Sequence, residues 1–135
     1  MASISAIIPA YNATTRYLDQ AIGSALSQTH APSEVIVVDD ASSDDTAGLV
    51  ARFPRVRYVR RTENGGQAAA RNDGAKLATG EFLAFLDQDD LWEPTFLEEA
   101  LAVLQAMTII FTPRATSPSM ISSANCRTSA SERGP

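Results

Sequence analysis

Two apolar segments of the chain end abruptly on clustered aspartates. Residues 35–38 run into Asp39 and Asp40, and residues 82–86 run into the sequence Asp87-Gln88-Asp89-Asp90. Short apolar runs of this kind predict buried strands, and a buried strand that ends in acids carries oxygen ligands to the rim of a sheet. Carboxylates gathered at one edge repel one another unless a cation, a basic ligand or raised pKa values relieve them. The pattern therefore predicts a site for a hard cation and for the phosphates that it neutralises.

A purely structural alternative exists for each of these acids, because Asp is common in turns and at helix N-caps. Asp89 or Asp90 could cap the helix expected near Glu93-Pro94, which has proline in its first turn. One strand ending in Asp would indicate little. Two apolar strands that each end in adjacent acids favour a site over capping alone.

The remaining periodicity predicts strands that alternate with helices. The expected strands are residues 4–8, 35–38, 56–59 at an edge, 82–86 and a last short one at 108–111. The expected helices carry apolar stripes over residues 18–26, from 46 to about 53, 67–78 and about 95–107. Alternation of this kind predicts an α/β fold with a Rossmann-like, doubly wound, mostly parallel sheet, whose ligands bind beyond the carboxyl ends of the strands.

Length and composition bound the alternatives. The 135 residues suit one domain, expected over residues 1–112, while residues 113–135 are rich in Ser, Thr and Pro and are expected to be disordered or loosely attached. A net charge of -5 argues against a general nucleic-acid binder, so no nucleic-acid partner is expected. The single Cys126 can form no internal disulfide. With no targeting segment and no apolar run of about 18 residues, no transmembrane segment is expected, and a cytoplasmic location is the default.

Phosphate binding here would need a source of positive charge other than a glycine loop. The first strand is followed by Pro9-Ala10-Tyr11-Asn12, with neither a dinucleotide-binding nor a P-loop glycine pattern. Mn or Mg on Asp89 and its neighbours would supply that charge. Tyr11 could stack on a base or merely cover a helix start, and Asp39 could accept an N–H from the base. Arg71 could meet a base, a phosphate or the acids, or lie solvated on its helix.

Five segments together resemble the family 2 glycosyltransferases, nucleotide-sugar-dependent enzymes of GT-A fold. The resemblance extends from about residue 3 to residue 97. The matching segments are residues 5–12, 21–29, 34–42, 64–66 with 70–74, and 80–92, which contains the D-x-D element Asp87-Gln88-Asp89.

The resemblance implies a role for each matching residue. Pro9, Ala10, Tyr11 and Asp39 would hold the base and ribose of a nucleotide-diphospho-sugar donor, most readily a uridine or thymidine form. Arg71 and Asp87 would assist on the nucleotide side. Asp89, with Asp87 or Asp90, would hold the cation that bridges the diphosphate and stabilises the departing nucleoside diphosphate. The acceptor would be a saccharide or a lipid-linked hydroxyl compound, and the sugar, acceptor and oligomeric state stay open.

The chain departs from the family pattern after about residue 97. Family members continue for roughly a hundred residues more, beyond one small domain, with acceptor-binding strands and a carboxylate that deprotonates the acceptor. After Glu99 this sequence has a single acid, Glu132, so no catalytic general base is expected, and the fold is expected to be incomplete at its C-terminus. The expected function is the donor-binding half of a truncated transferase. The alternatives are a non-catalytic nucleotide-binding fragment and a Mg-binding receiver-like signalling domain. A receiver domain would need a lysine on the rim of the sheet, but the only lysine, Lys76, is expected in the middle of a helix.

Overall fold

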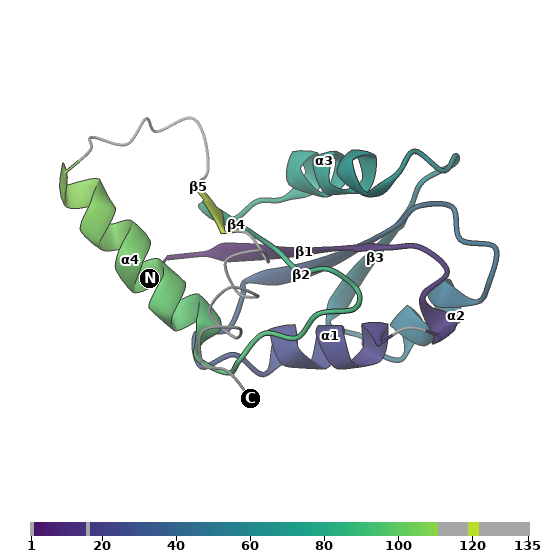
Figure 1. Cartoon of the computed structure of the whole chain (residues 1–135), viewed down its shortest axis with the longest axis horizontal. Helices are drawn as coiled ribbons and strands as arrows, with labels where there is room; N and C mark the ends of the chain where they lie inside the picture. The colour runs from purple at the N-terminus through teal and green to yellow at the C-terminus, as the bar shows by residue number, and fades with distance from the viewer. Residues whose placement is uncertain (1, 16, 111–118, 122–135) are drawn as a thin grey trace.

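A parallel sheet with helices on both faces forms the centre of the protein (Figure 1). The computed structural model describes residues 2–15, 17–110 and 119–121, and within them the sheet has five strands in the order β3-β2-β1-β4-β5. Every neighbouring pair of strands runs parallel, which confirms the doubly wound sheet expected from the sequence. The strands are β1 (Ile4–Ala10), β2 (Glu34–Asp39), β3 (Val56–Arg60), β4 (Phe82–Phe85) and β5 (Ser119–Ile121).

The helices divide between the two faces of the sheet. Helices α1 and α2 cover one face and α3 covers the other (Figure 1). The described helices are the short 3-10 helix η1 (Ala13–Thr15), α1 (Leu18–Leu26), α2 (Thr46–Ala51), α3 (Gln67–Leu77) and α4 (Phe96–Ile110). Since successive side chains of a strand point to opposite faces, each central strand contributes side chains to the hydrophobic cores on both faces of the sheet. On β1, Ile4, Ala6 and Ile8 pack on the α1 side, whereas Ile7 packs beneath α3.

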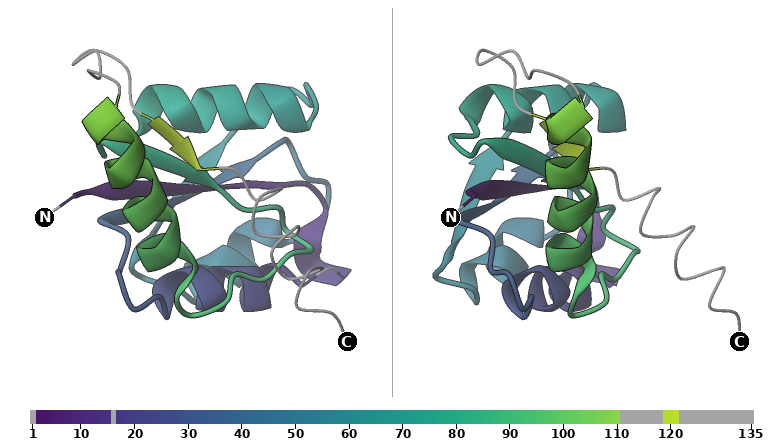
Figure 2. Two further views of the ribbon diagram at one scale, coloured as in Figure 1. Left: turned by 60° about the vertical axis from the view of Figure 1, so that its left-hand side comes forward. Right: turned by 90° about the vertical axis from the view of Figure 1, so that its left-hand side faces the viewer.

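The chain changes direction across the sheet next to β1. From β1 it passes through α1 to β2 and then through α2 to β3, and α3 carries it back to β4 on the other side of β1. The switch point of the sheet therefore lies between β1 and β4, and ligands of such sheets bind beyond the carboxyl ends of the strands at that point. The segment after β4 then runs back along the α1 face to α4 at the opposite end of the sheet (Figures 1 and 2).

Helix α3 approaches the sheet closely because a glycine faces it. A Cβ at Gly74 would lie 2.5 Å from Cγ2 of Ile7, far inside van der Waals contact. Ala70, one turn earlier, is fully buried on the same face. The two small residues let the helix lie low over β1 and bring its first turn to the switch point.

The strand expected at residues 108–111 is wrong for 108–110, which form the last turn of α4, and Phe111 lies outside the described residues. A short apolar run does not distinguish a strand from a helical segment, and here α4, which carries Leu97, Leu101 and Leu104 at helical spacing, extends to Ile110. In the expected tail, residues 119–121 pair with β4; the rest, with Cys126 and Glu132, lies outside the described residues. None of the helices in the described part of the chain is long and apolar enough to cross a membrane.

Candidate functional site

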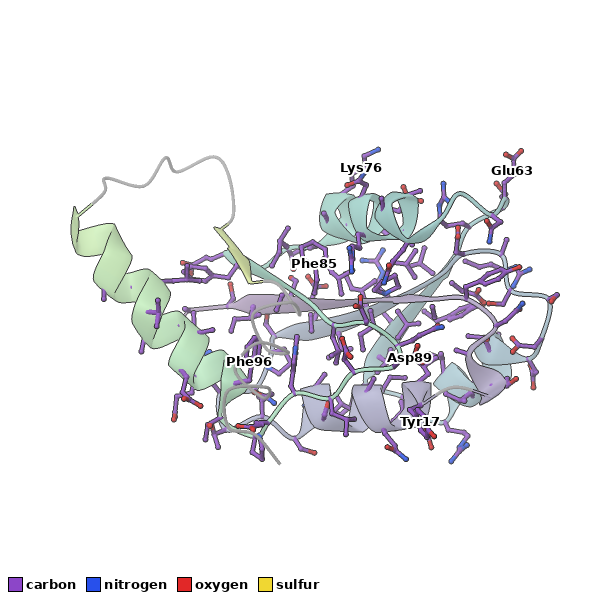
Figure 3. All side chains as sticks on the ribbon, in the orientation of Figure 1. Tyr17, Glu63, Lys76, Phe85, Asp89 and Phe96 are labelled. Carbon is purple, nitrogen blue, oxygen red and sulfur yellow. The ribbon has the colours of Figure 1, made fainter. Side chains whose placement is uncertain are left out.

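A cleft of about 700 Å³ opens at the switch point, beyond the carboxyl ends of β1, β2 and β4. Figure 3 labels Asp89 at this end of the sheet and Phe96, where α4 begins, towards the other end. Six of the predicted site residues line the cleft, whereas Asp39 and Arg71 do not. The lining residues are Pro9, Ala10, Tyr11, Asp40, Asn64, Gly66, Gln67, Ala70, Asp87, Gln88, Asp89 and Asp90.

Asp39 lies behind the cleft, not in it. Its side chain is fully buried and accepts hydrogen bonds from the backbone N–H and hydroxyl of Ser42, from the hydroxyl of Tyr58 and from Nη1 of Arg60 at 3.3 Å. The sequence assigned this residue to the base of a nucleotide. Because Asp39 shares the α1 face of β2 with Val35 and Val37, its carboxylate turns into the protein and fixes the following turn instead.

Asp40, its neighbour, turns towards the cleft. Oδ1 accepts hydrogen bonds from Nη1 of Arg61 at 2.8 Å and from the N–H of Gly65 at 2.9 Å, and Oδ2 accepts one from the N–H of Gly66 at 2.8 Å. Burial alone would raise the pKa of Asp40, but these hydrogen bonds and the charge of Arg61 hold its pKa below the usual value. Arg61 is itself fixed by Asp73 of α3, at 2.7 Å. Asp40 is therefore an ionised carboxylate held in a fixed position on the cleft wall.

Asp87 is bound by the first two turns of α3. Gln67 and Arg71, four residues apart on one face of that helix, both donate to Oδ1 of Asp87, from Nε2 at 2.7 Å and Nη2 at 2.6 Å. Arg71 thus meets the acidic cluster, one of the possibilities that the sequence left open. Its Nε is buried and has no hydrogen-bond acceptor among the described residues.

The loop after β1 presents Tyr11, whose side chain is 45% exposed. Its backbone is fixed on both sides: the N–H of Tyr11 donates to Gln88, and the N–H of Asn12 donates to Ser42. Asn12 has a left-handed φ of 47°, which asparagine tolerates better than most residues, and its side-chain oxygen accepts from the N–H of Ser43. The exposed ring of Tyr11 therefore stands on an ordered loop.

Asp44 connects the loop after β1 to the start of α2. The carboxylate of Asp44 accepts from the N–H and hydroxyl of Thr14 and from the N–H and hydroxyl of Thr46. Burial opposes ionisation here, but the four hydrogen bonds outweigh it and lower the pKa of Asp44. Asp44 has a structural role that the sequence alone did not reveal.

Three arginines relieve the charge of the acidic rim. The sequence required a cation, a basic ligand or raised pKa values for this, and the protein supplies guanidinium groups. The pairs are Arg60 with Asp39, Arg61 with Asp40, and Arg71 with Asp87. Within residues 2–15, 17–110 and 119–121, no group of three His, Cys, Asp or Glu side chains is close enough to form a metal cage. The expected cluster of Asp87, Asp89 and Asp90 is thus not a preassembled cage.

Several residues that line the cleft were not predicted from the sequence. Gln88, Gln67 and Asn64 are uncharged polar side chains, which carry little signal in one sequence. The position of Gln88 between two acids after a strand was the available clue, since side chains in such a loop lie near the neighbouring strand end. Gln67 could have been found from its spacing to Arg71.

Comparisons with known proteins relate the chain to one family. The sequence profile of the family described as Glycosyl transferase family 2 matches residues 5–124. The uncharacterized glycosyltransferase alr2836 of Nostoc sp. is 38% identical over 112 residues, which are 79% of this chain and 34% of that protein. The glucosyltransferase WfgD of Escherichia coli, named for UDP-Glc and alpha-D-GlcNAc-diphosphoundecaprenol, is 39% identical over 80% of this chain and 43% of its own length.

Solved structures show the same fold. The crystal structure of S. aureus TarS 1-349 in complex with UDP-GlcNAc superposes with a TM-score of 0.70 and 32% identity, covering 77% of this chain and 31% of that one. The chain thus spans less than half the length of each of these relatives. This agreement confirms the GT-A type of fold expected from the sequence. Since the profile covers residues 5–124 of the 135 residues, the chain belongs to glycosyl transferase family 2.

Proposed function

We propose that the cleft binds the nucleoside diphosphate of a UDP-sugar, and that the chain supplies the donor-binding part of an enzyme that transfers the sugar to an acceptor hydroxyl. The observation that carries this proposal is the composition of the cleft: an exposed aromatic ring and a fixed carboxylate lie on one side, and a row of acids lies on the other. A uracil base and a metal-bridged diphosphate need those two environments. The UDP-GlcNAc complex of TarS and the name of WfgD support a uridine donor.

On the base side, Tyr11 would stack on the ring and Asp40 would accept an N–H from its edge. An ionised carboxylate has about four acceptor positions, and the structure fills three of those of Asp40 with Arg61, Gly65 and Gly66. The low pKa of Asp40 keeps it an acceptor at neutral pH. The role that the sequence gave to Asp39 therefore passes to its neighbour, with Pro9 and Ala10 forming the floor beside it.

On the diphosphate side, Asp89 and Asp90 present carboxylate oxygens, the ligands that Mg and Mn prefer. Enzymes of this family commonly use a divalent cation. A cation of this kind is usually held by one or two carboxylates together with substrate phosphates, so the absence of a three-acid cage among the described residues fits it. When bound, the cation would act as a Lewis acid towards the leaving diphosphate.

The chain's own groups would complete that side of the cleft. The positive end of the α3 dipole points at the cleft through Gly66 and Gln67, which favours an anion. Arg71 lies behind this wall and holds Asp87 in place through Nη2. The helix dipole therefore favours a negatively charged ligand at this wall, while Arg71 positions one of its acids.

For the acceptor, we propose a saccharide hydroxyl, lipid-linked as in the name of WfgD. We assign no described residue to its deprotonation: the acids of the first turn of α4 belong to an element at the other end of the sheet (Figure 3). A receiver-like function is disfavoured, because the exposed Lys76 points away from the cleft on the outer side of α3 (Figure 3).

Calorimetric titration of the chain with UDP, CDP, GDP and ADP tests the proposal. We expect UDP to bind more tightly than the others, and EDTA to weaken its binding unless Mn or Mg is restored. Asp89→Asn should reduce the effect of Mn at least about tenfold, as changes around metal sites typically do, whereas the control Asp19→Asn on α1 should not. Equal binding of all four nucleotides, or UDP binding that is indifferent to EDTA, would contradict the proposal.

A further inference from the structure

The pairing of β1 with β4 stops where the cleft begins. The last backbone hydrogen bond between the two strands runs from the N–H of Leu86 to the carbonyl oxygen of Ile7, at 3.0 Å. In a parallel ladder the next donor from β1 would be residue 9, and Pro9 has no N–H to give. The two strand ends therefore have no backbone bond to continue the ladder at the point where they must present the two walls of the site.

A side chain resumes the pairing two residues later. The carboxamide of Gln88 accepts from the N–H of Tyr11 at 2.8 Å, and its Nε2 donates to the carbonyl oxygen of the same residue at 3.3 Å. One side chain thus binds both backbone groups of one residue, as a neighbouring strand would. Both residues line the cleft, and the link joins the two walls.

We propose that Gln88 is a positioning residue that sets the spacing between the Tyr11 loop and the flanking acids, so that nucleotide and divalent cation bind cooperatively. This inference rests on the proposed function. With the link in place, a cation that orders the acids also orders the loop that receives the base. A base that orders the loop likewise orders the acids that receive the cation. By linkage the two ligands then raise each other's affinity by the same factor.

The chemistry of glutamine suits this position. A glutamate would keep the acceptor for the N–H of Tyr11, but it would lose the donor and add a further negative charge between Asp87 and Asp89. An alanine would remove both bonds. Glutamine alone among these three gives a two-bond link without charge.

The first test needs no ligand. Amide hydrogen exchange, followed by NMR on the whole chain, should show the Tyr11 amide exchanging about three- to tenfold faster in Gln88→Ala, the effect of losing one ordinary hydrogen bond. The amides of Asn12 and Ala13, which donate to Ser42 and Thr46, should change by less than about twofold. An unchanged Tyr11 amide overturns the inference, and so does equal acceleration of all three amides. This result stands whether or not UDP binds.

The second test measures cooperativity. The ratio of UDP affinities with and without Mn should fall about fivefold or more in Gln88→Ala, the lower end of coupling between linked sites. Gln88→Glu should lower it too, and Gln20→Ala on the exposed side of α1 should not. A ratio that stays at the wild-type value refutes cooperativity through Gln88, even if both affinities drop. If the wild-type chain itself binds no UDP, the proposed function fails, and the exchange experiment alone decides the role of Gln88.

Discussion

Arg61 and Asp40 form an ion pair with 2.8 Å between Nη1 and Oδ1, and this pair fixes the entrance to α3. The same carboxylate accepts the N–H groups of Gly65 and Gly66, and Gly66 has a left-handed φ of 91°. The turn before the helix is thus folded around one charged group from the end of β2. Since Gly66 and Gln67 line the cleft, the ion pair also determines the shape of its wall.

Removing the guanidinium should loosen that wall. In Arg61→Met the bonds to Asp40 and Asp73 are lost while much of the side-chain volume remains, and we expect a loss of stability of about 1.5–3 kcal/mol, the range for hydrogen bonds to charged groups. UDP affinity should fall as well. Urea denaturation and calorimetry measure the two effects. Arg55→Met, at an exposed turn position, is the control; equal stability of the two variants would show that the ion pair contributes little.

The close approach of α3 to the sheet predicts a difference between two glycines. Gly74→Ala places a methyl group 2.5 Å from Ile7, whereas a Cβ at Gly23 of α1 meets nothing within 4 Å. Both substitutions gain the same helix propensity, so the comparison isolates the steric effect. Gly74→Ala should be less stable than Gly23→Ala by about 1–3 kcal/mol, the usual cost of overpacking. Urea midpoints that coincide would mean that α3 can shift away without cost.

Stability should fall on acidification because three carboxyls have lowered pKa values. Burial opposes the shift at Glu34, but hydrogen bonds from Ser5 and Thr79 bring its pKa below the usual 4.5, and Asp40 and Asp44 lie below the usual 3.8. A group with a lowered folded pKa binds protons more readily in the unfolded chain. Its contribution is therefore fully present above the unfolded pKa and is lost as pH falls through the folded one.

The measurement is the urea midpoint between pH 7 and pH 2. We expect a plateau above about pH 5 and a steep decline below about pH 4. Glu34→Gln should lower the plateau and make the decline shallower, since one of the three groups no longer titrates. Glu98→Gln, at an exposed position of α4, should retain the wild-type profile. A wild-type midpoint that stays constant down to pH 2 would contradict the assignment.

The sequence was sufficient for the sheet and insufficient for the direction of individual side chains. Apolar runs and helical stripes predicted the strands and helices because burial imposes those periods on this chain. The end of β2 shows the limit. Asp39 and Asp40 are adjacent, so they point to opposite faces, and which of them meets the cleft depends on which face α3 covers.

Arginine pairing was a second limit of the sequence. Arg60 and Arg61 are about twenty residues from their partners along the chain, and the register of β3 against β2 brings them together: Asp39 lies directly opposite Arg60. The sequence predicted an edge strand over residues 56–59, directly before these two arginines, and indicated no partner for either of them. Their charges serve the acidic rim only because that edge strand ends beside it.

Removing the charge of Asp39 or of Asp40, one at a time, should distinguish the residue that stabilises the fold from the residue that binds the nucleotide. Asp39→Asn keeps the volume but weakens the bonds to Tyr58, Ser42 and Arg60 in a fully buried place, so we expect a loss of about 1–3 kcal/mol in the free energy of unfolding. Because Asp39 does not line the cleft, the UDP affinity of the fraction that is folded should change little.

Asp40→Asn, in contrast, should lower the affinity for UDP. The amide cannot accept as many hydrogen bonds as the carboxylate, so the N–H of a uracil base must compete with Gly65 and Gly66 for the remaining oxygen. We expect UDP affinity to fall about tenfold or more, since a lost hydrogen bond to a charged group is worth about 1.5–3 kcal/mol. Affinity for Mn in the absence of nucleotide should be unchanged. Calorimetry on both variants, below their unfolding temperatures, compares them directly. If Asp39→Asn loses UDP binding while Asp40→Asn retains it, the base contact belongs to Asp39 after all, and the turn after β2 must rearrange when the nucleotide binds.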